Sequence, residues 1–191
     1  MSYLLDANVF IQAKNLHYGL DFCPAFWDWL VENNAAGRVF SIDKVENEIA
    51  AGADELNDWV RERGNGLFLK TDSPVAAQFG KVSAWVMQQQ YEPGAINTFL
   101  QVADFYLIAH ALAAGYVIVT HEVPANSAKR VKIPNACIGL DVGFLTPYEM
   151  LRKEHARFVL SGRDGHLRRI RQLTARVARY WSTKRRTARR G

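Results

Sequence analysis

The chain has 191 residues and a mass of 21.6 kDa, and its 49% hydrophobic and 12% aromatic residues are enough for one sizeable core. This composition excludes a disordered, collagen-like or low-complexity protein. The net charge of +5 is unevenly divided, because residues 161–191 contain ten Arg, one Lys and one Asp and so carry +10, whereas residues 1–160 carry −5. The asymmetry favours a polyanionic partner, most commonly a nucleic acid, although an acidic protein or a membrane surface suits the same charge.

The two cysteines and the N-terminus indicate the compartment. Cys23 and Cys137 could form one disulfide, but a chain of this size does not need it, so we expect both thiols to be packed as small hydrophobic groups in a reducing compartment. The N-terminus lacks the basic segment of a secretory signal, and no stretch reaches the roughly 18 uncharged apolar residues of a membrane helix. We therefore expect a cytoplasmic protein without membrane association.

Strand and helix patterns alternate along the chain. In chain order they predict a strand at 3–5, a helix at 23–35, a strand at 39–42, a helix at 43–63, a strand at 66–69, helices at 73–90 and 94–114, a strand at 115–120, a strand within 139–145 and a helix at 146–159. This alternation predicts an α/β fold, a three-layer α/β/α sandwich with a mainly parallel sheet.

Residues 1–160 are expected to form a single domain, because no linker rich in Pro, Gly or Ser divides them. Beyond them, Ile170, Leu173, Val177 and Trp181 recur at three- and four-residue spacing, which predicts a basic, amphipathic C-terminal helix in residues 161–191. We expect Ser182 to Gly191 to be a mobile tail. The alternative is a tail that is solvated along its whole length.

Two carboxylates follow predicted strands. Asp6 ends the first strand, and Glu122 follows the strand at 115–120. Ligands of parallel α/β sheets bind beyond the carboxyl ends of the strands, so both side chains are candidate site residues. Each also has an ordinary alternative, because Asp6 could cap a helix and Glu122 could be a polar loop residue.

Asp104 lies within an apolar helical pattern. On a helix it would share one face with Leu100, Leu107, Ile108 and Ala111. An ionised carboxylate on such a face costs several kcal/mol unless a cation compensates its charge. The alternatives are a structural ion pair or a cap exposed at the helix start, but the neighbouring apolar face contains no Lys or Arg.

Glu48 lies in a second helical pattern, between Val45 and Ile49, and can lean toward an apolar face. The alternative is a solvated helix, and a capping box between Asp43 and Glu46 would suit its start.

Four carboxylates could therefore meet at one edge of the sheet. They are Asp6, Glu48, Asp104 and Glu122. Acidic side chains that converge without basic partners repel one another unless hard cations bind between them. The set predicts a site for Mg²⁺ or Mn²⁺.

The segments that contain these residues resemble a known family. LLDANVFI, VENEI and ADFYLIAHALAAGYVIVTHE, in this order and spacing, are similar to PIN-domain nucleases, the fold of the VapC-type toxins of bacterial toxin–antitoxin pairs. LDFCPAFWDWL, GRVFSIDKVENEI, VKIPNACIGLDV and TPYEML extend the resemblance over about residues 2–155, to a PIN subfamily of unknown function.

The resemblance implies a PIN-like parallel sheet and a metal-dependent endoribonuclease. By position, it implies that the catalytic and metal-binding residues are Asp6, Glu48, Asp104 and Glu122. RNA, single-stranded or structured, is then the expected substrate, and the antitoxin of a toxin–antitoxin pair is a further expected partner. The sequence leaves open which RNA is cut, whether DNA is cut and whether the chain forms a homodimer.

Several polar residues lie close to these carboxylates in the sequence. Lys129, Arg130 and Lys132 form a basic patch, and a phosphate backbone near the metals accounts for it about as well as an ordinary surface cluster does. Asn8 and Thr120 could support the ligands, although ordinary hydrogen bonds to the backbone are the expected role.

Two other functions compete with the nuclease. A catalytically weak nucleic-acid-binding protein would bind through the basic tail and use the acidic body as a scaffold. A membrane-surface or protein-interaction module would use the predicted tail helix.

Overall fold

The computed structural model describes residues 1–159, and the compact unit discussed below comprises Met1–Ala156. The predicted C-terminal helix and mobile tail, residues 161–191, lie outside the described residues. They stay predictions, as does the expected domain boundary at residue 160.

Helices and strands alternate over the described residues. In chain order they are β1 (Tyr3–Leu5), α1 (Ala7–Gln12), the π-helical segment η1 (Ala13–His17), α2 (Pro24–Ala35), β2 (Val39–Ile42), α3 (Asp43–Ala50), α4 (Glu55–Arg63), β3 (Phe68–Leu69), α5 (Ser73–Ala76), α6 (Phe79–Met87), α7 (Pro93–Phe99), α8 (Ala103–Ala114), β4 (Val117–Val119), α9 (Ile133–Leu140), β5 (Phe144–Leu145) and α10 (Pro147–Lys153). Each predicted strand is present within its expected range.

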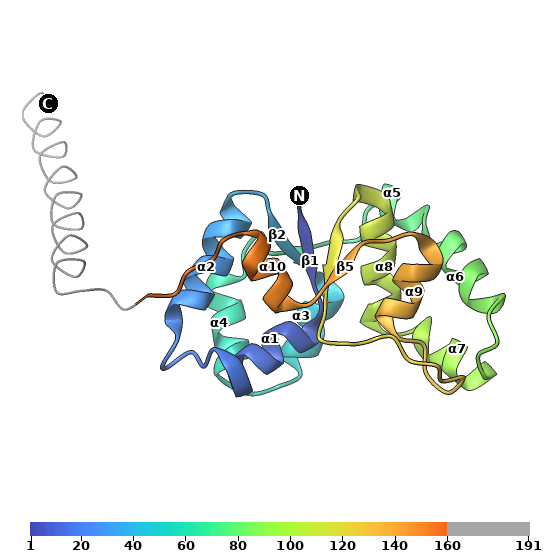
Figure 1. Cartoon of the computed structure of the whole chain (residues 1–191), viewed down its shortest axis with the longest axis horizontal. Coiled ribbons are helices and arrows are strands. Elements are labelled where there is room, and N and C mark those ends of the chain that lie inside the picture. Colours follow the sequence, from blue (N-terminus) through green and yellow to red (C-terminus); the bar gives the residue numbers. More distant parts are fainter. Residues whose placement is uncertain (160–191) are drawn as a thin grey trace, which may run out of the picture. The chain divides into compact units, whose positions relative to one another are not determined.

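The five strands form one parallel sheet in the order β3-β2-β1-β4-β5. Tyr3 of β1 is in register with Val39 of β2 and with Val117 of β4, so β1 is the central strand. Figure 1 shows α2 and α10 on one side of the sheet and α8 and α9 on the other. The predicted α/β fold, with helices on both faces of a parallel sheet, is confirmed.

The central strands are apolar along their length. Tyr3, Leu4 and Leu5 of β1 are buried, and so are Ile118 and Val119 of β4. A strand that is covered on both faces cannot alternate apolar and polar residues, because both sets of side chains face helices. This is why short continuous apolar runs were sufficient to predict these strands.

The predicted helix at 43–63 is two helices, α3 and α4. The chain turns after α3, and Asp54 starts α4 by accepting hydrogen bonds from the N–H groups of Leu56 and Asn57. The predicted helix at 73–90 is likewise divided into α5 and α6, where Asp72 caps α5 through the N–H of Val75.

The predicted helix at 94–114 is also wrong as a single element, because α7 ends at Phe99 and α8 begins at Ala103. The backbone at Val102 is extended, with φ −98° and ψ 167°, so the two helices have different directions. Asp104 therefore lies in the first turn of α8, and Leu100, which was expected on the same helical face, lies outside that helix.

Helix α9, at Ile133–Leu140, was not predicted, and its last residues fall in the range expected to contain a strand. Pro134 in its first turn and the left-handed residue Asp141 at its end are ordinary start and stop features of a helix. The predicted helix at 146–159 is α10, which begins with a capping box between Thr146 and Glu149 and ends at Lys153.

Both cysteines are free thiols; Cys137 is buried, as expected of a packed thiol, and Cys23 is half-buried. Burial raises the pKa of the Cys137 thiol to about 12, which keeps it neutral in the core. No single helix within residues 1–159 is long and apolar enough to cross a membrane, and α7 with α8 meets both limits only as a pair bent by 63°. The cytoplasmic location stays a prediction.

Candidate functional site

The strand order places the carboxyl ends of β1 and β4 side by side. The chain adds β2 and β3 on one side of β1 and then β4 and β5 on the other, so the winding direction reverses between β1 and β4. The N–H of Asp6, directly after β1, donates to the carbonyl of Val119 at 3.0 Å, and Thr120 directly follows β4. Ligands of parallel α/β sheets bind at such a reversal point, so the candidate site begins here.

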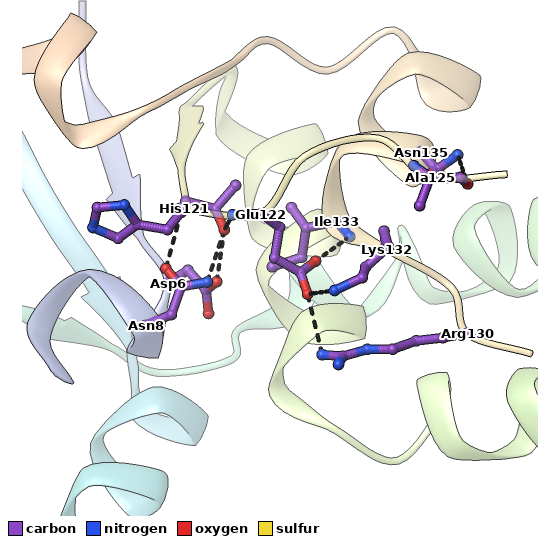
Figure 2. Close-up of polar contacts among 10 residues, drawn as sticks. Asp6, Asn8, His121, Glu122, Ala125, Arg130, Lys132, Ile133 and Asn135 are labelled. Atoms are coloured by element: carbon purple, nitrogen blue, oxygen red, sulfur yellow. Dashed lines mark hydrogen bonds and ion pairs between the residues drawn. The ribbon is translucent and has the colours of Figure 1, made fainter. Parts of the chain in front are cut away.

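A side-chain network holds the Asp6 carboxylate, which is only 6% exposed. Thr120 Oγ1 donates to Asp6 Oδ2 at 2.8 Å, and Asn8 Nδ2 donates to Thr120 Oγ1 at 3.0 Å. Asn8 Oδ1 in turn accepts the N–H of His121 at 3.0 Å, which ties α1 to the loop after β4 (Figure 2). Asp6 precedes α1, but its side chain makes no capping hydrogen bond to that helix.

Thr120 and Asn8 have a larger role than the sequence indicated. They bond backbone N–H groups, those of Glu122 and His121, as expected. In addition, their side chains form the chain of hydrogen bonds that ends on Asp6. The sequence shows that Thr120 follows a predicted strand, but only the strand order shows that this strand, β4, lies beside β1 and so places the hydroxyl next to Asp6.

Helices α3 and α8 pack against each other and contribute Glu48 and Asp104. The backbone N–H of Ala103, the first residue of α8, lowers the pKa of the Glu48 carboxyl against the raising effect of burial. The expected capping box between Asp43 and Glu46 does not form, because Asp43 is already the first residue of α3 and the helix has no side-chain cap. The Oδ1 atom of Asp43 is buried and has no hydrogen-bond partner among the described residues.

Three of the carboxylates have raised pKa values. Burial, together with the charges of Glu122 and Glu48, raises the pKa of Asp6 to about 6 against the lowering effect of the Thr120 hydrogen bond. Burial and the neighbouring carboxylates raise the pKa of Asp104 to about 7 against the lowering effect of the Arg130 charge. Burial also raises the pKa of Glu48, although the residue as a whole is exposed. Within residues 1–159 no Lys, Arg or His forms an ion pair with these three side chains.

Glu122 is in a different electrostatic state. Its Oε1 accepts hydrogen bonds from Lys132 Nζ at 2.6 Å and from Arg130 Nη2 at 3.1 Å, and its Oε2 accepts the N–H of Ile133 at 3.0 Å (Figure 2). Two cations of the chain itself therefore compensate its charge.

All four predicted carboxylates line one pocket of about 650 Å³. The wall includes Asp6, Glu48, Asp104 and Glu122, with Asn8 beside them and with Lys129 and Arg130 as its positive residues. Apolar residues of α1 and α7, such as Ile11 and Phe99, complete the wall. The structure thus brings the four side chains to one pocket, and their functional role stays a prediction.

The chemistry of the donor set fits a hard divalent cation, because three carboxylates with raised pKa values face one pocket without a positive partner. Their spacing does not form a finished site, since no three His, Cys, Asp or Glu side chains in residues 1–159 lie close enough together to hold one ion. The carboxylates would have to move toward one another to share it.

Comparison with known proteins relates the chain to one family and to several structures. Residues 3–158 match the model of a family described as "Domain of unknown function (DUF4411)". No curated protein matches the sequence. The chain is structurally similar to FitAcB from Neisseria gonorrhoeae, at 19% identity and a TM-score of 0.46, and to VapBC-1 from nontypeable Haemophilus influenzae, at 14% and 0.47.

VapBC2 from Rickettsia felis, in a structure with a DNA fragment from its promoter, is similar at 14% identity and a TM-score of 0.49. Each of these three comparisons covers 76% of this chain and 98% of the other. The expected structural similarity to VapC-type proteins is therefore present, at low identity.

Proposed function

The chain belongs to the DUF4411 family, a domain of unknown function, and on that premise we propose that it is a divalent-metal-dependent nuclease that hydrolyses the phosphodiester bonds of RNA. One observation carries the proposal: Asp6, Glu48 and Asp104, from three separate elements, face one pocket and have no ion-pair partner within the described residues. The resemblance of the sequence to PIN-domain nucleases supports RNA as the substrate.

Mg²⁺ or Mn²⁺, when bound, would lower the pKa of a water molecule and offset negative charge on the phosphate. Asp6, Glu48 and Asp104 are the residues proposed to hold the ion. Thr120 and Asn8 keep the Asp6 carboxylate in one orientation through their hydrogen bonds. Ionised carboxylates only accept hydrogen bonds, so one of the three can also orient the attacking water as a general base.

The positive side of the pocket supports a phosphodiester substrate. A pocket lined only by carboxylates would repel RNA, but Lys129 and Arg130 also line it. Both follow Glu122 in the loop that leads to α9, so positive and negative groups meet at one place. Such positive groups attract the phosphate backbone of a substrate toward the pocket.

The proposal is tested by incubating purified protein with a labelled single-stranded RNA in EDTA, in Mg²⁺ and in Mn²⁺. We expect cleavage only with metal, and we expect Asp104→Asn to reduce it at least about 100-fold. Glu48→Gln and Glu46→Gln are a matched pair on α3, and only Glu48 lines the pocket. Glu46→Gln should keep parental activity. Equal cleavage by the parent and by Asp104→Asn, prepared in the same way, would contradict the proposal.

The finer proposal, from the resemblance to VapC-type toxins, is that the chain is a toxin whose antitoxin covers the acidic pocket. Induced expression should then arrest growth, and Asp104→Asn should relieve the arrest. Normal growth under expression of an active nuclease would separate the enzymatic proposal from the toxin proposal.

A second candidate function is nucleic-acid binding without catalysis, and the +10 charge of residues 161–191 favours it. In that case RNA would be bound equally by the parent and by Asp104→Asn, and neither would cleave it in Mn²⁺. The same incubation, followed by a binding measurement, distinguishes the two functions.

A further inference from the structure

The ion pairs of Glu122 differ in exposure. The Glu122 side chain is 10% exposed and that of Lys132 is 24% exposed, whereas the Arg130 side chain is 66% exposed. The Lys132 ammonium alone is sufficient to neutralise the carboxylate. Arg130 therefore brings a second positive charge, which also acts on Asp104, and it lies on the wall of the acidic pocket.

Glu122 also organises the loop that contains Arg130. Its Oε2 accepts the N–H of Ile133, the first residue of α9, so one carboxylate joins the end of β4 to the start of the next helix. Ala125 and Asn135 exchange two further hydrogen bonds of 3.1 Å each across the same loop. The loop is thus tied at two places, and this restricts where the Arg130 side chain can lie.

The contact between Arg130 and Glu122 leaves the guanidinium able to bind an anion. Only Nη2 takes part in the hydrogen bond, and a guanidinium has five N–H donors in a planar fork that matches the oxygens of a phosphate. A ligand role for Glu122 is less compatible with these contacts, because its carboxylate would have to exchange two cations and a backbone N–H for the metal.

We propose that Arg130 binds a phosphate of the nucleic-acid backbone at the pocket, and that Glu122 is the positioning residue that holds Arg130 and Lys132 instead of a ligand of the metal. The identification of the anion as RNA rests on the proposed function. The separate roles of Arg130 in phosphate binding and of Glu122 in positioning do not rest on it, because metal binding and phosphate binding can each be measured without cleavage.

The role of Glu122 is tested by the rise in Tm that Mn²⁺ causes in the full chain without RNA. We expect Glu122→Gln to keep most of the parental rise and Asp104→Asn to lose it. An equal loss in Glu122→Gln and Asp104→Asn would overturn the proposal and make Glu122 a ligand. If Glu122→Gln does not fold, Lys132→Met serves instead, because it removes a Glu122 partner. A Mn²⁺ effect equal to that of the parent is then expected, and a larger one would show that the freed Glu122 binds the metal and would overturn the proposal.

The role of Arg130 is tested by RNA binding in the Asp104→Asn background, where cleavage does not interfere. Arg130→Ala should weaken the binding of a single-stranded RNA about 10-fold and should flatten the dependence of log K on log salt by about 0.7, the value for one phosphate contact. Arg130→Lys should restore part of the affinity. Arg61→Ala, an exposed arginine of α4 outside the pocket wall, is the matched control and should bind as the background does.

Positioning is tested by combining the two changes in the same background. If Glu122 acts through Arg130, Glu122→Gln should weaken RNA binding when Arg130 is present and should have little further effect when Arg130 is alanine. In the active protein both single variants should raise KM about 10-fold with kcat near the parental value. Unchanged affinity and salt slope in Arg130→Ala would overturn the proposal. An absence of cleavage by the parent would contradict the proposed function alone.

Discussion

At Asp104, the pKa of about 7 has a consequence for the stability of the metal-free protein. The ordinary value is 3.8, so the folded state binds this proton more tightly than the unfolded chain does. The stabilising effect of the proton is fully present below pH 4 or so and is lost as the pH rises through about 7. Near neutral pH without metal, the ionised carboxylate therefore works against folding.

The prediction is that in EDTA the free energy of unfolding decreases from pH 5 to pH 8, with a contribution from Asp104 on the order of 2 kcal/mol. Asp104→Asn should remove that contribution and be no less stable than the parent at pH 8. Denaturant unfolding of both proteins at the two pH values measures the effect. Parallel pH dependences in the parent and the variant would show that Asp104 is not strained by its neighbours.

Thr120 is the residue on which the site network converges, because its hydroxyl bonds Asp6, Asn8 and the N–H of Glu122. Thr120→Val keeps the shape of the side chain and removes all three bonds at a fully buried position. We expect a loss of about 1–3 kcal/mol in stability and a weaker response to Mn²⁺. Thr120→Ser keeps the hydroxyl and is the control. Urea unfolding and a Mn²⁺ titration of both variants measure the effect. Equal stability and an equal Mn²⁺ response in Thr120→Val and Thr120→Ser would show that the Thr120 hydroxyl does not support the site.

At the scale of the elements, α6 and α9 pack so closely that one glycine is required between them. A Cβ atom at Gly139 of α9 would overlap the Trp85 indole of α6. The overlap involves the body of a half-buried ring, which cannot move aside as the end of a flexible side chain could. The approach of the two helices therefore depends on a residue without a side chain.

Gly139→Ala should consequently destabilise the protein by about 1–3 kcal/mol. Gly80→Ala is the matched control, because Gly80 also lies in a helix, α6, and a Cβ there meets no atom within 4 Å. That change should leave stability unchanged or raise it by up to about 1 kcal/mol, since alanine favours helix. Thermal unfolding of the two variants measures the difference. A loss of the same size in both would point to a backbone effect of glycine and away from the Trp85 contact.

Over the whole molecule, charge is divided between an acidic body and a basic C-terminal segment. Residues 161–191 carry +10 and residues 1–160 carry −5, so RNA that approaches the acidic pocket needs attraction from elsewhere on the chain. The family match ends at residue 158, which leaves the whole basic segment outside it. We expect that segment to supply affinity for RNA and the body to supply the chemistry.

Deletion of residues 162–191 in the Asp104→Asn background should weaken RNA binding and flatten its salt dependence by about 0.7 for each phosphate that the segment neutralises. With Asp104 intact, the full-length and the truncated protein should show similar single-turnover cleavage at saturating RNA, because no proposed metal ligand lies in the deleted segment. A salt series of binding isotherms and a cleavage time course provide the two measurements. An unchanged salt slope would mean that the segment binds another partner, such as an antitoxin or a membrane surface.

The sequence was sufficient to predict the sheet and the carboxylates that line the pocket. Strands β1 and β4 are covered on both faces, so they must be continuous apolar runs, and such runs are visible without a structure. Asp6 and Glu122 were identified because parallel strands place their carboxyl ends at one edge. Asp104 was identified because a carboxylate within an apolar helical pattern needs a compensating charge, although the structure places it in the first turn of α8.

Only the tertiary structure decided the electrostatic state of each carboxylate. Glu122 is paired with Arg130 and Lys132 because a loop and the start of α9 return to the end of β4, and no periodic pattern predicts a contact over eight to ten residues of irregular chain. Asp104 has no such partner within the described residues, although both side chains line the same pocket. Composition and periodicity determine which residues are buried, whereas the charge that compensates a buried group comes from whichever distant segment packs beside it.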